Sequence, residues 1–160
     1  EDSLIAGLIK SARQYCESYQ NRALITQTIT AKMNDFPACN EFSLPMPELI
    51  SVTSIKYIDS NGVQQTLSTD VYAVDTFATP GRVVLKYNQS WPSVRGDYNS
   101  VEVVYIAGYG DEEDIPQVTK QAMLLIIGHL YENREETMAV ALQTIPTSAK
   151  DLLNFNRIFA

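Results

Sequence analysis

The most enzyme-like group of side chains in the sequence is a polar set near residue 130. His129, Glu132, Asn133 and Glu136 are spaced by three, four and seven residues, which places them on one face of a helix. An imidazole and carboxylates in this arrangement could hold a divalent metal that activates water, as in a nuclease or phosphatase. The set has no second histidine, and Arg134 interrupts it. A solvated helix end is therefore the simpler interpretation, and we predict no metal site.

Other catalytic patterns are missing from the sequence. Nucleophilic catalysis needs a Ser or Cys with a base in reach, but His129 is the only histidine and no G-x-S-x-G motif is present. The stretch Gly108-Tyr109-Gly110 lacks the residues that follow in nucleotide-binding loops. The acidic run at 111–114 lacks the alternate spacing and the glycine of a calcium loop. We therefore predict no enzymatic activity and no cofactor.

Aromatic residues in the middle of the chain allow a binding function. Trp91, with Tyr87 and Tyr98, could form a platform for a sugar ring or a base. A single tryptophan in a proline-containing loop also commonly fills the core of a small β unit. The sequence leaves both interpretations open.

Composition narrows the class of protein. The chain has 160 residues, 45% of them hydrophobic, and a formal net charge of -7, so it can build a core but has no basic run to grip nucleic acid. Cys16 and Cys39 are too few for a disulfide framework or a structural zinc site, which favours a reducing setting. Without a run of 18 apolar residues or a signal-peptide pattern, we expect neither a membrane anchor nor export.

Hydrophobic periodicity predicts helices at both ends of the chain. Apolar residues at intervals of three and four indicate a helix over about 2–20, and a second, long helix near 116–134 with Pro116 in its first turn. Residues 135–160 are predicted to form a linker and a short helix. Ser148 and Asp151 fit a capping box at the start of that short helix.

Residues 24–107 have the signals of antiparallel strands. Alternation predicts strands at 25–33 and 101–107, and Asn61-Gly62 is a strong hairpin signal between a long strand and the segment QQTLS. The proline-rich segment FSLPMPELI is expected to be extended and at a sheet edge. The fold class is therefore α+β: a helical core with an inserted antiparallel β unit at 24–107, within a single domain over 1–160.

The order of these segments resembles the head-tail connector (adaptor) proteins of long-tailed bacteriophages and prophages. The strings that carry the resemblance are SARQYCESYQNRAL, LPMPELISVTSIKYIDSNG, WP, VEVVYIAGYG and DIPQVTKQAMLLIIGHLYENRE, in this order. Each string alone is a weak pattern, but together they extend over nearly the whole chain.

The resemblance implies a structural virion protein of the neck, assembled in the bacterial cytoplasm. Such a protein docks as a homo-oligomeric ring, dodecameric on the portal protein, and extends the DNA channel toward the stopper or tail-completion protein. Genomic DNA would pass without specific binding, and no membrane or cofactor is involved. In connectors the C-terminal segment engages the portal. The residues that this implies as portal-binding are Leu152, Leu153, Phe155, Ile158 and Phe159.

The residues themselves agree with a ring. The long helix is apolar on nearly every face between Ala122 and Ile127, so it needs neighbours on more than one side. The candidate subunit contacts are Met123, Ile126, Ile127 and Leu130. We also expect removal of residues 148–160 to leave the fold intact but to abolish attachment to the portal. The alternative function is a β-rich, virion-associated module that recognises a carbohydrate or protein ligand through the Trp91 loop.

Overall fold

The structure is a computed structural model and describes residues 2–133 and 145–159. Contacts between Cα atoms divide the chain into two compact units: the helical unit, Glu1–Leu24 with Gly110–Ala160, and the β unit, Ile25–Tyr109. Antiparallel strands thus lie between helical segments of the chain, which confirms the predicted α+β class. The assignment of one connector domain over 1–160 stays a prediction.

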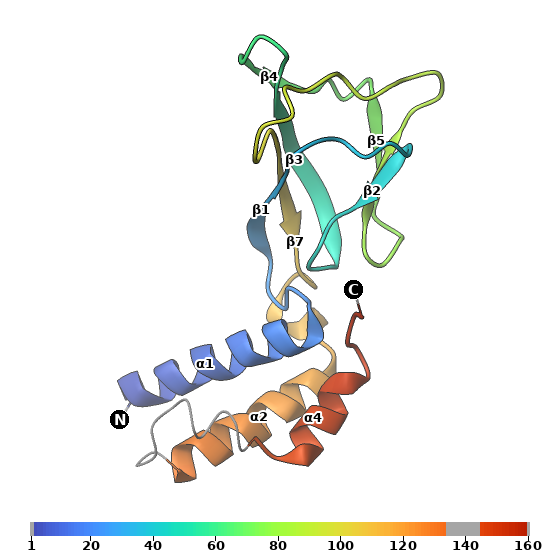
Figure 1. Cartoon of the computed structure of the whole chain (residues 1–160). Helices are drawn as coiled ribbons and strands as arrows, with labels where there is room; N and C mark the ends of the chain where they lie inside the picture. Colours follow the sequence, from blue (N-terminus) through green and yellow to red (C-terminus); the bar gives the residue numbers. More distant parts are fainter. Residues whose placement is uncertain (1, 134–144, 160) are drawn as a thin grey trace. The chain divides into compact units, whose positions relative to one another are not determined.

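The helical unit packs two helices against a third (Figure 1). Its elements are α1 (Asp2–Gln20), the 3-10 helix η1 (Glu112–Asp114), α2 (Gln117–Glu132) and α4 (Thr147–Asn154). Both α1 and α4 contact α2, and they also contact each other. The core consists of side chains spaced mostly by four residues, which share one helix face. They are Leu8, Ala12, Cys16 and Gln20 of α1, Thr119, Ala122, Ile126 and Leu130 of α2, and Ala149 and Leu153 of α4.

The two later helices begin at prolines. Pro116 is the N-cap of α2, which begins at Gln117, one residue later than predicted, and the acidic residues before Pro116 form η1. The predicted capping box at Ser148 is wrong, because α4 begins at Thr147 after Pro146 and no side chain caps it. The carbonyl of Pro146 instead accepts the N–H groups of Ala149 and Lys150, at 3.0 and 3.3 Å. A proline tolerates this position because a helix start needs no N–H from it.

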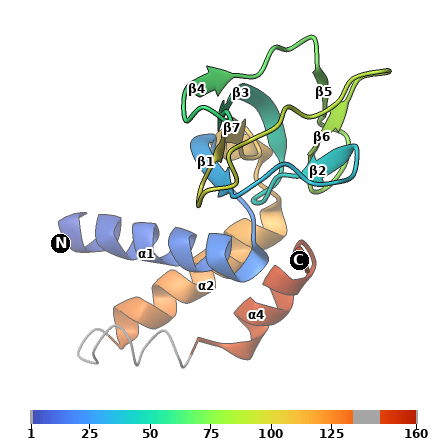
Figure 2. The ribbon, with the colours of Figure 1, turned by 45° about the horizontal axis from the view of Figure 1, so that its top comes forward.

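The β unit holds two antiparallel sheets, both visible in Figure 2. The first has the strand order β1 (Gln27–Met33), β7 (Val101–Ala107), β3 (Leu49–Ile58), β4 (Gln64–Thr66). The second has the order β2 (Glu41–Ser43), β6 (Arg82–Leu85), β5 (Tyr72–Asp75). Alternate residues of β7 are buried, as its sequence alternation predicts.

Local turn chemistry decides two of the connections. The Asn61-Gly62 hairpin is confirmed, with β3 paired to β4 and Gly62 at a φ of +81°. The prediction of one extended edge segment over FSLPMPELI is confirmed only for its start. Phe42 and Ser43 belong to β2, an edge strand of the second sheet, but the prolines interrupt pairing, and Leu49 begins β3, which lies inside the first sheet. Proline cannot donate a ladder hydrogen bond, but pairing resumes as soon as the prolines end.

Among the described residues, no helix combines the length and the apolar composition that crossing a bilayer requires.

Candidate functional site

The C-terminal segment is divided between the core and the surface of the helical unit. Leu153 is fully buried, and Leu152 and Ile158 are half-buried. Phe155 and Phe159 remain 78% and 79% exposed. Of the five predicted portal-binding side chains, these two are therefore the ones free to reach a partner. Leu153 instead stabilises the chain's own fold, because α4 packs on α2 and α1.

The same packing changes what a truncation would do. Residues 148–160 include Ala149 and Leu153, both fully buried in the core of the helical unit. This burial argues against the expectation that removing them spares the fold, and we now expect the truncation to destabilise the helical unit. Loss of this segment would expose to water the apolar surface of α2 and α1 on which α4 packs, and exposing buried apolar surface is destabilising.

Hydrogen bonds hold the C-terminal segment beyond α4 in place. The N–H of Ile158 donates to the carbonyl of Gln20, and the amide of Asn21 donates to the carbonyl of Ile158, both at 2.9 Å. The guanidinium of Arg22 donates to the carbonyl of Asn156 at 2.7 Å. The exposed phenylalanines are thus presented on an ordered backbone, which lowers the entropy lost on binding. Sequence reasoning missed this role of residues 20–22, although a polar run just after a helix was a usable signal.

The predicted subunit contacts on α2 also divide into two groups. Ile126 and Leu130 are buried in the helical unit, whereas Met123 and Ile127 are half-buried. Leu124, which the sequence analysis did not select, is 59% exposed. The reason is that α1 and α4 cover one side of α2 and leave part of its apolar surface in contact with solvent.

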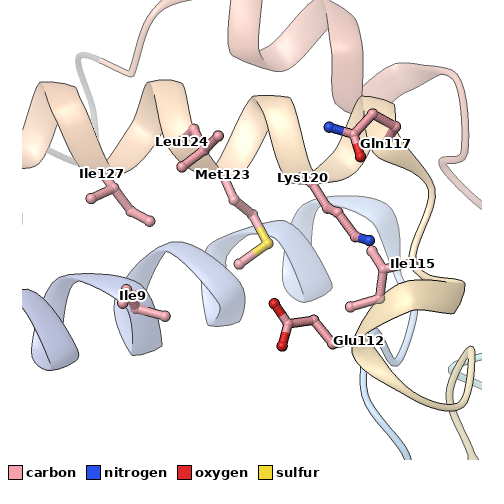
Figure 3. A pocket seen from close by; sticks show the side chains of 8 residues that line it. All are labelled: Ile9, Glu112, Ile115, Gln117, Lys120, Met123, Leu124 and Ile127. Atoms are coloured by element: carbon pink, nitrogen blue, oxygen red, sulfur yellow. The ribbon is translucent and has the colours of Figure 1, made fainter.

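A groove of about 360 Å³ opens beside this exposed apolar surface, between α1, η1 and α2 (Figure 3). We call it the α1–α2 groove. The side chains that line it are Ile9, Glu112, Ile115, Gln117, Lys120, Met123, Leu124 and Ile127. Ile9, Met123, Leu124 and Ile127 form its middle and one end. Glu112, Gln117 and Lys120 lie toward the other end, together with the apolar Ile115. Such an arrangement suits an apolar helix that carries a charge at one end.

The tryptophan of the β unit packs among other aromatic rings. The Trp91 ring stacks on Phe36 at a centroid distance of 5.0 Å and meets the Phe42 ring at 5.5 Å. Its indole N–H donates to the carbonyl of Cys39 at 2.9 Å. Trp91 thus fills a small aromatic cluster, whereas Tyr87 and Tyr98 are 99% and 89% exposed. Of the two interpretations left open by the sequence, these contacts support the structural one.

The polar set around His129 has a structural explanation as well. The amide of Asn133 lies 3.1 Å from the Nδ1 atom of His129 and donates to its carbonyl at 2.8 Å. These contacts satisfy polar groups at the C-terminal end of α2. Glu136 lies outside the described residues. Within residues 2–133 and 145–159, no three His, Cys, Asp or Glu side chains are grouped as metal ligands would be.

The two cysteines are free thiols in different surroundings. Cys16 is buried in the helical unit, and burial raises the pKa of its thiol to about 12, with a further contribution from the charge of Glu17. This thiol is therefore protonated at neutral pH and unsuited to nucleophilic attack. Cys39 is exposed and donates its S–H to the carbonyl of Glu41.

An ion-pair network joins the strands of the second sheet. The guanidinium of Arg82 lies 2.9 Å from Asp75 and 3.1 Å from Glu41. Asp75 also accepts the N–H groups of Phe77 and Ala78, which fixes the turn after β5. The hydrogen bond from Arg82 and those two N–H groups hold the pKa of the Asp75 carboxyl below its ordinary value.

This network predicts a pH-dependent stability. A lowered pKa in the folded state stabilises the fold above the carboxyl's ordinary pKa, and the effect is lost as pH falls through the folded value. Asp75→Asn should therefore be destabilising at pH 7, and its difference from the parent chain should shrink below about pH 4. Urea titrations at several pH values measure this. In an Arg82→Met background the pH-dependent difference should shrink to the part that the N–H groups of Phe77 and Ala78 supply, and an unchanged difference there would contradict the role of Arg82.

Comparison with solved structures identifies the class of fold. The neck of an empty gene transfer agent particle, computed with C6 symmetry, contains a chain that is 20% identical with a TM-score of 0.80, over all of this chain and 80% of that one. A chain in the native neck, computed with C12 symmetry, is 19% identical with a TM-score of 0.77, and the match covers 98% of this chain and 83% of that one. A chain in the virion of the native gene transfer agent particle is 20% identical with a TM-score of 0.80, and the match covers 100% of this chain and 79% of that one. The fold is therefore one found in particle necks.

The family follows from the sequence itself. The family model described as head completion protein matches residues 1–155, and the chain belongs to this family. The resemblance to head-tail connectors is thereby confirmed, and the chain is a structural protein of a phage-like particle. No curated protein matches the sequence.

Proposed function

We propose that this chain forms a homo-oligomeric ring in the neck of a phage-like particle, docks under the portal, and extends the DNA channel toward the stopper and tail. It acts through protein contacts and without catalysis. The family match over residues 1–155 supports this proposal, as does the likeness of the fold to chains in C6 and C12 necks. The observation that carries the docking step is the pair of exposed phenylalanines on an ordered C-terminal segment.

The charge of the chain is compatible with a DNA conduit. The formal net charge is -7, and like charges on protein and phosphates disfavour adhesion of the passing DNA. We therefore propose that genomic DNA crosses the ring without specific binding. The proposed partners are the portal protein, the stopper or tail-completion protein, and further copies of the chain.

The docking step predicts a loss of portal affinity. The double variant Phe155→Ala, Phe159→Ala should keep its fold, because both side chains are largely exposed. It should bind the portal ring from the same genome roughly 10- to 100-fold more weakly, since each phenylalanine loses apolar burial on the portal. Cosedimentation with the portal ring at a series of concentrations measures the affinity.

The matched control for this experiment is Phe77→Ala. Phe77 is 99% exposed but belongs to the β unit, so its substitution removes a similar aromatic surface from a different part of the chain. We expect its portal affinity to equal that of the parent. Equal portal binding by the parent chain and by the Phe155, Phe159 double variant would refute portal docking through the C-terminal segment.

A further inference from the structure

Arg157, in the C-terminal segment, packs its guanidinium on aromatic rings. Its Cζ atom lies over the Tyr19 ring, 4.6 Å from the ring centroid, and over the Phe159 ring, 5.1 Å from that centroid. Tyr19 stacks on Tyr15 at a centroid distance of 5.9 Å and donates its hydroxyl to the side-chain oxygen of Asn154 at 3.1 Å. We call Tyr19, Arg157 and Phe159 the arginine stack. These contacts restrict the guanidinium to a position next to an exposed phenylalanine.

The guanidinium of Arg157 lacks an oxygen acceptor. Aromatic rings attract its charge but do not replace a carboxylate as acceptor of its N–H groups. Its Nε atom is buried and has no hydrogen-bond partner among the described residues. The other described arginines each contact a carboxylate or a carbonyl; they are Arg13, Arg22, Arg82 and Arg95. Arg157 is therefore the arginine of the described chain whose preferred partner is missing.

We infer that the arginine stack binds a carboxylate of the portal, an Asp or Glu side chain beside an apolar pocket that receives Phe159. This inference rests on the proposed function and names the chemistry of the partner surface. A guanidinium can pair with a carboxylate through two parallel hydrogen bonds, and its planar shape lets it stay stacked on a ring while it does so. The apolar ring beside the pair would exclude water, which strengthens the attraction between the charges.

The surroundings of Arg157 favour a protein carboxylate over a DNA phosphate. Its neighbours Asn154 and Asn156 are neutral, and the guanidinium of Arg22 is occupied by the carbonyl of Asn156. Affinity for DNA depends on several cations that neutralise phosphates together, whereas this chain has a formal net charge of -7. One arginine among aromatic side chains is instead the composition typical of the residues that dominate protein–protein binding energy.

The first test removes the charge of Arg157 and keeps most of its bulk. Arg157→Met should leave circular dichroism unchanged and bind the portal ring from the same genome roughly tenfold more weakly than the parent chain. Cosedimentation measures the affinity. The difference between the two chains should shrink in about 1 M salt, because salt screens the charge pair. The matched control is Arg95→Met, since Arg95 lies in the β unit and pairs with Asp97 at 3.0 Å. We expect this control to bind the portal as the parent does.

A charge exchange separates a carboxylate contact from a merely structural role of Arg157. Arg157→Glu should lose portal binding, and each exposed Asp and Glu of the portal is then replaced by Arg in turn. One of these portal variants should restore binding to the Arg157→Glu chain and weaken binding of the parent. A positioning role for Arg157 within its own chain would allow no such rescue, so a complete scan without a rescuing variant would overturn the inference.

Two further outcomes would also overturn it. One is equal portal binding by the Arg157→Met chain and the parent chain. The other is displacement of the parent chain from the portal by double-stranded DNA, which would assign the guanidinium to phosphate. In both cases, loss of portal binding by the Phe155→Ala, Phe159→Ala variant would still support docking through the C-terminal segment. A parent chain that did not bind the portal would refute the proposed function itself, so the two failures are distinguishable.

Discussion

Replacing Ile126 by aspartate is expected to unfold the helical unit. Ile126 is fully buried in the core that α2 shares with α1 and α4. Removing a buried isoleucine side chain commonly costs about 2–5 kcal/mol, and an unpaired carboxylate in its place adds a desolvation cost. Since domains of this size are stable by only about 5–15 kcal/mol, little stability of this unit should remain. Loss of helical circular dichroism at 25 °C measures the effect.

Leu124→Asp is the matched control on the same helix. It introduces the same carboxylate two residues away, but Leu124 is 59% exposed, so the charge stays hydrated. The control should retain the helical signal and, at concentrations where the parent chain is monomeric, melt within a few degrees of it. Equal melting temperatures for both variants would show that Ile126 is not a core residue. The pair therefore separates the chain's own core from its exposed apolar surface.

Gly108→Ala is expected to destabilise the β unit strongly. Gly108 follows β7 with a φ of +138°, a conformation that side-chain-bearing residues rarely adopt. A Cβ atom there would lie 2.4 Å from the carbonyl oxygen of Ile25 and 2.7 Å from the nitrogen of Thr26. Both are backbone atoms, so relief requires the chain to shift. We expect a loss of about 3 kcal/mol in the free energy of unfolding, from backbone strain and this clash together.

Gly96→Ala provides the comparison for Gly108. Gly96 also has a positive φ, +78°, but a Cβ atom there meets no heavy atom within 4 Å. Its substitution should cost only the conformational strain, about 1 kcal/mol. Fluorescence of Trp91, the single tryptophan and part of the β unit, monitors urea unfolding of both variants. If Gly108→Ala were no worse than Gly96→Ala, the close approach of the Ile25 backbone would be refuted.

Exposed apolar side chains connect these predictions to the proposed function. A chain that acted alone would gain little from leaving Leu124, Phe155 and Phe159 in solvent. In the proposed function, binding to the portal would bury such side chains on a partner. The exposed phenylalanines of the C-terminal segment are proposed as the portal contact, and the double variant Phe155→Ala, Phe159→Ala tests that contact.

Local sequence determined much of the secondary structure. The helix at 2–20, the strand at 101–107 and the Asn61-Gly62 hairpin follow from periodicity and turn chemistry within a few residues, and the structure confirms them. The start of α4 did not follow, because Ser148 and Asp151 satisfy the capping pattern while Pro146 sets the actual boundary. Two local signals competed there, and the pattern alone could not rank them.

The sequence by itself determined the family, the α+β class and which helices are amphipathic, because these properties depend on residue order and periodicity along the chain. Only the tertiary structure decided which apolar residues are core and which are surface. Ile126 and Leu124 have similar side chains two positions apart, and Leu153 and Phe155 both looked suited to a partner. Burial depends on what packs against a helix from distant parts of the chain, and α1 and α4 cover only one side of α2.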